Sequence, residues 1–197
     1  MLAFGPRVAR RYGMRCLTLA LAFFLAPLLA QAQSPADKRA AAEKLLDALP
    51  TVPSEEAAAP LEAQIRELLL NAGSPAVTLL MSRGLRELRA EANDDAIEDF
   101  GDAIALDPTL AEAYHQRAIA RYHAGDTRGA ITDIEATLKQ EPRDFAALQT
   151  LSRISEARED WKGAYAAWQK VLAIDPKTPG GADHLKELKR KALGEET

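Results

Sequence analysis

One phrase occurs three times along the chain at a constant spacing. It reads AIEDFGDAIALDP at residues 96–108, AITDIEATLKQEP at residues 130–142 and AYAAWQKVLAIDP at residues 164–176. Successive copies begin 34 residues apart, and each ends in a proline. A fixed period of 34 residues is typical of solenoids that are built from helix-turn-helix units. The sequence therefore predicts an all-α fold in which similar helix pairs stack on one another.

Small and bulky residues follow one another at helical spacing in each copy. A small residue comes first, a bulky residue follows four positions later, and a third residue follows three positions after that. The three sets are Ala96, Phe100 and Ala103, then Ala130, Ile134 and Thr137, and then Ala164, Trp168 and Val171. These spacings place each set on one helix face. Because small residues allow paired helices to approach closely, we expect this face to be core, and the proline to end each second helix.

The period, the small and large positions and the terminal proline resemble the tetratricopeptide repeat (TPR) family, and the stretch GSPAVTLLMSRG resembles short exported bacterial members of it. The resemblance implies a right-handed helix-turn-helix solenoid of three units. We place these units at residues 77–110, 111–144 and 145–178. One departure is that the eleventh position, which is usually aromatic in the family, holds Glu87, Arg121 and Ser155.

Helical segments flank the three units on both sides. Residues 33–76 are expected to form an N-terminal helical extension or cap, with an apolar stripe along its second helix. Residues 179–197 are expected to form a C-terminal capping helix and tail, because a stacked array needs its open ends covered. The cations of this last helix suit a helix C-terminus, and a basic site for an anionic lipid or polysaccharide is the alternative.

The first 32 residues have the pattern of an export signal. Four arginines precede an apolar stretch, and Ala30-Gln31-Ala32 offers a small-x-small cleavage pattern, so we expect cleavage after Ala32 and a periplasmic protein without a stable membrane anchor. The start codon could encode Met1 or Met14. Cleavage would remove four arginines and no acid, which takes the formal charge from −4 to −8. A chain this acidic argues against a nucleic-acid partner.

Two units carry an arginine and an aspartate at the same two positions. The first unit has Arg83 and Asp99, and the second has Arg117 and Asp133. The third unit lacks both, with Leu151 and Ala167 in their places. Because the two residues appear and disappear together, we predict structural ion pairs between the two helices of units one and two.

The family resemblance also implies where a partner would bind. In TPR proteins, the first helix of each unit lines a concave groove, which suits an extended peptide or a partner helix. The corresponding residues that we select here are Met81, Leu85, Leu88, Glu112, His115, Ile119, Tyr122, His123, Gln149, Arg153 and Glu156. The alternative for the first three is that the N-terminal helices cover them as core. The carboxylate clamp by which some relatives hold chaperone tails is absent, since its positions hold Met81, Leu85, Gln116, Ala146 and Thr150.

Few residues suggest catalysis or metal binding. Glu112 and His115 have the Glu-x-x-His spacing of carboxylate-bridged iron sites, but the sequence has no second copy, so we interpret the spacing as accidental. His115 and His123 are eight residues apart on one helix, or about 12 Å, which is too far to share a metal. We therefore expect no cofactor, no metal and no enzymatic activity.

These observations together favour an adaptor or assembly factor that binds another protein in its concave groove. Two alternatives stay open. The chain could associate with itself, so that a second copy fills the groove. It could also be a small metal-dependent enzyme that uses Glu112, His115 and His123.

Overall fold

The computed structural model describes residues 34–194, and the expected signal segment lies outside them. The described chain is helical: α1 (Pro35–Ala48), the short 3₁₀ helix η1 (Leu49–Thr51), α2 (Glu55–Leu70), α3 (Pro75–Arg89), α4 (Asn93–Leu106), α5 (Ala111–His123), α6 (Thr127–Gln140), α7 (Phe145–Ala157), α8 (Trp161–Ile174) and α9 (Gly181–Leu193). Within this part of the chain, no helix combines the length and apolar character that a membrane crossing needs.

Most helices begin at a side chain that accepts a hydrogen bond from the first turn. Ser34 and Asp37 form a reciprocal capping box at the start of α1, and Ser74 accepts from Val77 at the start of α3. Aspartates do the same at α6, α7 and α8. These caps satisfy backbone N–H groups that have no partner inside the helix. Short polar residues therefore set where these helices begin, whereas α4, α5 and α9 begin without such a cap.

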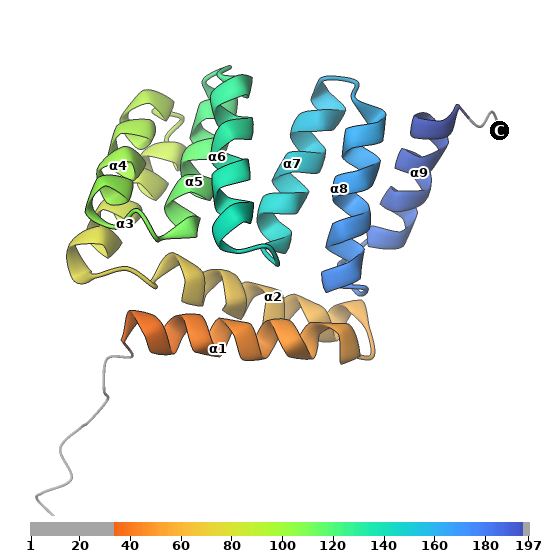
Figure 1. Ribbon diagram of the computed structural model, residues 1–197, viewed down its shortest axis with the longest axis horizontal. Coiled ribbons are helices and arrows are strands. Elements are labelled where there is room, and N and C mark those ends of the chain that lie inside the picture. The colour runs from red at the N-terminus through yellow and green to blue at the C-terminus, as the bar shows by residue number, and fades with distance from the viewer. Residues whose placement is uncertain (1–33, 195–197) are drawn as a thin grey trace, which may run out of the picture. The chain divides into compact units, whose positions relative to one another are not determined.

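Helices α3 to α8 form three antiparallel pairs that stand side by side (Figure 1). The second and third pairs lie within the expected repeat units, and the first pair matches its unit except that α3 begins two residues earlier, at Pro75. The small residues of the repeat are fully buried, as are Phe100 and Ile134, which pack between the helices. Gly84 faces the ring of Phe100 so closely that an added Cβ would lie 2.8 Å from it. The predicted all-α repeat solenoid is thus confirmed.

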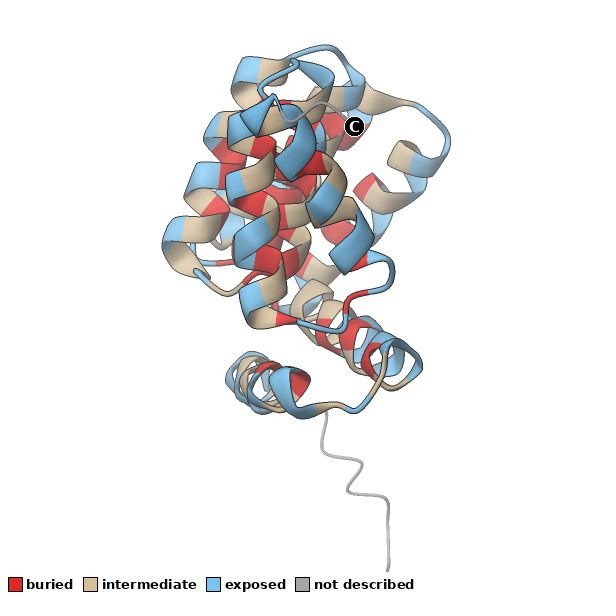
Figure 2. Cartoon of the chain, turned by 90° about the vertical axis from the view of Figure 1, so that its right-hand side faces the viewer, coloured by how far each residue is buried: buried red, intermediate tan, exposed pale blue. Residues whose placement is uncertain are grey.

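Helices α1 and α2 run along the lower edge of the array, across the ends of the repeat helices (Figure 1). Their apolar residues form one cluster with Phe145, the first residue of α7, together with the half-buried Ala146 and Ile174. Figure 2 shows buried residues gathered between the helices, while the outer side of α1 is exposed. The N-terminal pair therefore covers the edge where α7 begins and α8 ends.

Helix α9 packs on α8 at the far end of the array. Leu188 is fully buried there, and the indole N–H of Trp168 donates to the carbonyl oxygen of Gly181 at 2.9 Å. Lys191 lies 4.3 Å from the centre of the Trp161 ring, a cation–π contact. Basic side chains near the end of α9 also suit the helix dipole. These contacts attach α9 to the third repeat pair.

Candidate functional site

The residues of the expected groove that come from α3 belong to the hydrophobic core or pack against it. Met81 is fully buried in the cluster that contains Phe100, and Leu70 and Ala72 at the end of α2 join the same cluster. Leu85 and Leu88 are half-buried against it. The apolar side chains of α3 thus stabilise the first pair, and they offer little surface to a partner.

The next two residues, Glu112 and His115, are buried in the middle of the array. Glu112 accepts a hydrogen bond from the amide of Gln116 at 2.6 Å. His115 lies 3.0 Å from the hydroxyl of Thr150 on α7. Burial alone would lower the pKa of His115, but the carboxylates of Glu112 and Asp144 outweigh this effect and raise it. These residues do not line an open groove.

The last turn of α5 is more accessible. Ile119 and Tyr122 are half-buried, and Tyr122 packs against the core of the second unit. His123 is exposed, one turn beyond Ile119. A partner that extends along the array could contact these side chains, although removing the Tyr122 ring would also remove part of the core.

The last three expected residues border an open hollow at the C-terminal end of the array. Gln149, Arg153 and Glu156 lie along one face of α7, with Arg153 exposed. The hollow encloses about 370 Å³, and its remaining walls come from Trp168 on α8, Pro179 and His184 on α9. We call this hollow the α7–α9 groove.

Contacts between helices hold the side chains of the α7–α9 groove in place. His184 Nε2 lies 3.1 Å from the Glu156 carboxylate, and its ring meets that of Trp168 edge to face with 4.4 Å between the ring centres. Gln149 donates to the hydroxyl of Thr178 at 3.2 Å. The groove therefore offers a fixed aromatic pair, a paired acid and the exposed guanidinium of Arg153. Such a mixture can hold a peptide by stacking, ion pairing and hydrogen bonding.

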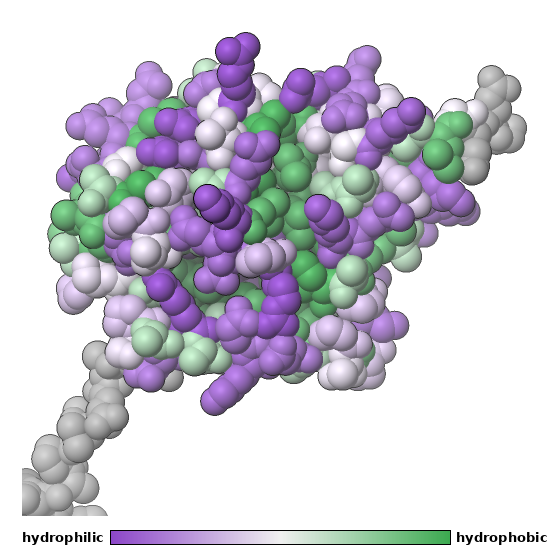
Figure 3. Space-filling model, viewed as in Figure 1, coloured by the Kyte–Doolittle hydropathy of each residue, from purple (hydrophilic) through white to green (hydrophobic). Residues whose placement is uncertain are grey.

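Outside the α7–α9 groove, the exposed hydrophobic residues do not gather into a binding surface. On the face shown in Figure 3, hydrophobic residues form strips between hydrophilic side chains, which project along the upper edge and across the middle of α1. The large hydrophobic residues that are well exposed, Leu79, Leu106 and Leu193, come from three different helices. Scattered exposed leucines are ordinary on protein surfaces and do not define a binding site.

The expected arginine–aspartate pairs are present in both units. Arg83 contacts Asp99 through two guanidinium nitrogens, and Arg117 contacts Asp133 in the same way. Both aspartates are buried. In the third unit Ala167 is buried and Leu151 packs against the core. These arginines join the two helices of each unit, because each guanidinium pairs with a buried aspartate of the other helix.

Several residues at these sites were missed by sequence reasoning. Trp168 was assigned to the core, and His184 was counted only as part of a capping helix, yet both line the α7–α9 groove. Asp144, which lies close to Glu112 and His115, is a third residue that the repeat pattern does not single out as a ligand. A signal for Asp144 existed, because the equivalent positions of the other units hold Leu110 and Thr178, so only the middle unit places an acid there.

Comparisons with known proteins agree with the architecture. A TPR repeat-containing protein of Rhizobium etli is 30% identical over 127 residues, which cover 64% of this chain and 62% of that protein. Mouse tetratricopeptide repeat protein 36 is 45% identical over 110 residues, covering 48% of this chain and 59% of that protein. The chain thus spans about 60% of the length of these relatives. No family model matches the sequence.

Solved structures share the fold at lower identity. The first TPR domain of Spaghetti (RPAP3), bound to the HSP90 peptide SRMEEVD, superposes with a TM-score of 0.57 at 18% identity and covers 62% of this chain and 96% of that one. The Sgt2 TPR domain from Aspergillus fumigatus gives a TM-score of 0.56 at 23% identity over 61% of this chain and 81% of that one. The stacked helix pairs define a helical-repeat protein. In sequence and in fold, the chain is similar to tetratricopeptide repeat proteins.

Proposed function

We propose that this chain is a protein-binding adaptor that holds an extended peptide or a helix of its partner in the α7–α9 groove. The observation that carries the proposal is the groove itself, an open hollow of about 370 Å³ with Arg153 exposed beside the Trp168–His184 ring pair. Arginine and aromatic side chains contribute most strongly to protein–protein interfaces. A rigid, preformed groove also lowers the entropy cost of binding.

The TPR relatives support this class of function. One of the structural neighbours is in complex with a chaperone peptide, and this peptide is what that protein binds. The chaperone clamp positions differ here, because Met81 and Thr150 are buried and Ala146 packs on the N-terminal helices. The partner of this chain is therefore a peptide of another kind, with a carboxylate for Arg153 and an aromatic or aliphatic side chain for the Trp168–His184 pair. The proposed role is binding and not catalysis.

The site of action that we propose is the periplasm. The support is the sequence pattern of residues 1–32, with its arginines, apolar stretch and small-x-small end. Cell fractionation of the native host, with mass spectrometry of the N-terminus, tests this part by itself. A mature chain that begins at Gln33 in the periplasmic fraction is expected. A full-length chain in the cytosol would overturn the location without touching the adaptor proposal.

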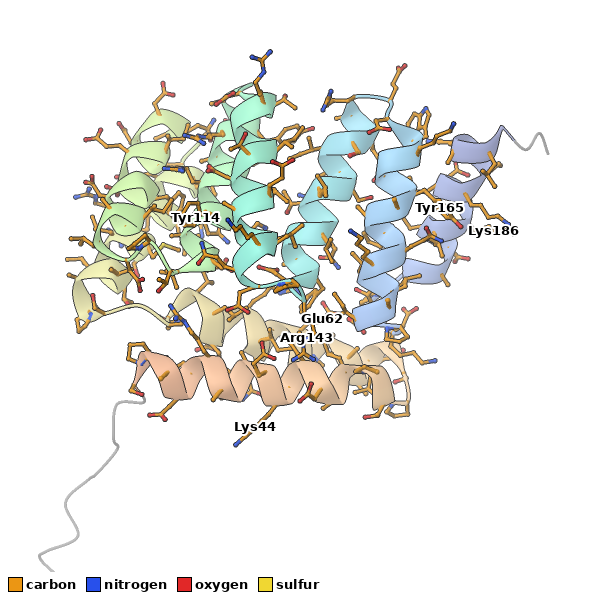
Figure 4. The ribbon with its side chains drawn as sticks, viewed as in Figure 1. Lys44, Glu62, Tyr114, Arg143, Tyr165 and Lys186 are labelled. Carbon is orange, nitrogen blue, oxygen red and sulfur yellow. The ribbon has the colours of Figure 1, made fainter. Side chains whose placement is uncertain are left out.

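The groove is tested by photo-crosslinking in native extract. A photo-crosslinking residue is placed at Arg153 in one variant and at Lys44 in the other. Lys44 points away from the repeat helices on the outer side of α1 (Figure 4), so it samples a surface far from the groove. We expect one protein to attach at position 153 and not at position 44, and mass spectrometry identifies it.

A matched pair of charge reversals then tests affinity for the identified protein. Arg153→Glu should weaken binding about tenfold or more, because it puts a like charge opposite the partner carboxylate and beside Glu156. Lys44→Glu makes the same change of charge outside the groove and should leave the dissociation constant unchanged. Equal loss in both variants, or crosslinking at Lys44 alone, would show that the partner binds elsewhere.

A further inference from the structure

Three side chains that can bind a metal ion meet inside the array. Glu112 and His115 come from α5, and Asp144 is the residue that caps the start of α7. One ligand atom from each lies within 4.8 Å of the other two, and all three residues are buried. The ring nitrogen Nδ1 of His115 and Oε1 of Glu112 are 3.7 Å apart. The repeat geometry thus brings together residues up to 32 positions apart in the sequence.

The hydrogen bonds of His115 show which ring nitrogen is free. The hydroxyl of Thr150 donates to the carbonyl oxygen of Ala146 at 3.0 Å, so its oxygen accepts from Nε2–H of His115. In the neutral ring, Nδ1 then carries the lone pair. This nitrogen is buried and has no hydrogen-bond partner among residues 34–194. A buried polar atom that is left unpaired costs free energy, and an electrophile at this position would remove that cost.

The two carboxylates lack a permanent counter-charge. Within the described part of the chain, neither Glu112 nor Asp144 forms an ion pair with an arginine or a lysine. The arginines at the edge of the neighbouring cavity are engaged with other acids, Arg66 with Glu62 and Arg143 with Glu43 and Asp47. Burying two carboxylates without a cation is expensive. A divalent cation between them would balance their charge.

We propose that Glu112, His115 and Asp144 bind a divalent transition metal ion of the Zn²⁺ class. One imidazole nitrogen with two carboxylates is a donor set that suits zinc better than calcium or magnesium, which prefer oxygen ligands alone. Tetrahedral zinc with bonds of about 2.0–2.2 Å places its ligand atoms about 3.3–3.6 Å apart. A ligand pair at the 4.8 Å limit would therefore close by about 1.2–1.5 Å, a shift that side-chain rotation can supply.

The surroundings fit a structural metal site with one water ligand. A cavity of about 10 Å³ borders Glu112 and Asp144, which is room for about one water molecule. The cavity lies under α1 and α2, with Ile65 and Leu69 in its wall. Because Glu112 and His115 belong to the second unit and Asp144 caps the first helix of the third, a bound ion would tie these two units together. The ion would stabilise the scaffold that carries the α7–α9 groove.

Zinc titration of the purified chain tests the site. The protein carries no polyhistidine tag and has Cys16→Ser throughout, so that this thiol contributes no binding. Isothermal titration calorimetry with Zn²⁺ at neutral pH should give one ion per chain, and Co²⁺ should give a visible d–d absorption band. Glu112→Gln and Asp144→Asn should each weaken zinc binding about tenfold or more, since each removes one charged ligand. Asn also caps helices well, so Asp144→Asn is expected to fold.

His123→Ala is the matched control. It removes an exposed histidine from the same helix and should leave the zinc affinity unchanged. Circular dichroism checks that each variant keeps its helix content, and a gain in Tm on adding Zn²⁺ should be lost in the Glu112→Gln variant. The absence of heat and of an absorption band would overturn the proposal and assign the balancing charge to a proton on His115. Zinc affinity that survives both ligand variants, or falls with His123→Ala, would also overturn it.

Discussion

Arg117 and Asp133 form a two-pronged ion pair between the helices of the second repeat unit. Nε donates to Oδ2 at 2.9 Å, and Nη2 donates to Oδ1 at 2.8 Å. Asp133 is buried and accepts a further bond from Arg121 at 2.8 Å. In the third unit, the same two positions hold Leu151 and Ala167. Equivalent positions in this one chain are thus filled in two ways, by an ion pair in the second unit and by apolar residues in the third.

This internal comparison makes the ion pair testable. Arg117→Leu should lower the free energy of unfolding by about 2–3 kcal/mol, because Asp133 stays buried with Arg121 as its remaining partner. The double variant Arg117→Leu with Asp133→Ala copies the third unit and should recover most of the loss. Urea unfolding at constant m-value measures both. If the double variant were as unstable as the sum of the two single variants, the pair would not act as one unit.

Two helical glycines should respond in opposite directions to replacement by alanine. A Cβ on Gly84 would lie 2.8 Å from the Phe100 ring, so Gly84→Ala should cost about 1–3 kcal/mol through overpacking. A Cβ on Gly101 would meet only Arg117 at 3.8 Å, so Gly101→Ala should gain about 0.5–1 kcal/mol through helix propensity. Thermal unfolding measures both. A stabilising Gly84→Ala would show that the two helices can move apart without cost.

The repeat could be predicted from the sequence because each unit carries its own pattern of small and bulky residues, and this pattern occurs three times. Ala96 and Phe100 predict their own burial from their spacing, and the terminal prolines fix the period. The ion pairs were predictable for the same reason, since Arg117 and Asp133 vary together with their equivalents. The similarity to tetratricopeptide repeat proteins followed from these positions, and the export signal and the periplasmic location stay predictions.

The sites were harder to predict, because they depend on contacts between units. Asp144 closes the second unit in the sequence and approaches His115 only when α7 of the third unit packs beside α5, and the spacing of the repeat does not predict that contact. The groove positions inferred from the family also assume that the first helix of every unit is accessible to a partner. Met81 is instead buried in the core of the first pair, where residues at the end of α2 join it. Such burial depends on how segments outside the repeat pack.

Glu62 gives a pH-dependent prediction. Burial, the hydrogen bond with Asp175 and the charge of Asp175 raise the pKa of Glu62, and Arg66 opposes them. A raised pKa means that the folded state binds the proton more tightly than the unfolded chain. The stabilisation is therefore full below the ordinary pKa of about 4.5 and is lost as the pH rises through the folded value. Figure 4 shows Glu62 at the junction between the N-terminal helices and the array.

Replacing Glu62 with glutamine should therefore stabilise the protein at neutral pH. Glu62→Gln removes the negative charge beside Asp175 and should raise the free energy of unfolding at pH 7 by about 1 kcal/mol, with the gain vanishing near pH 4. Thermal unfolding across this pH range measures the difference. Glu67→Gln makes the same change at an exposed position of α2 and should have no such pH profile. A gain of equal size at pH 4 and pH 7 would rule out protonation of Glu62 as the cause.

Phe145 should control whether the N-terminal pair stays attached to the array. It is the one fully buried residue that the repeat helices contribute to the apolar cluster of α1 and α2 within residues 34–194. Phe145→Ala should remove about 3–5 kcal/mol from that contact. Hydrogen exchange with mass spectrometry should show faster exchange across α1 and α2, while α5 and α6 keep their protection.

Phe100→Ala provides the comparison for this experiment. Phe100 is equally buried but lies inside the first repeat pair, so its loss should speed exchange in α3 and α4 and leave the contact of α1 with the array in place. The two variants thus separate the docking of the N-terminal helices from the stability of the repeats. If Phe145→Ala speeded exchange equally in every helix, then α1 and α2 would unfold together with the array, and Phe145 would be part of a single cooperative core.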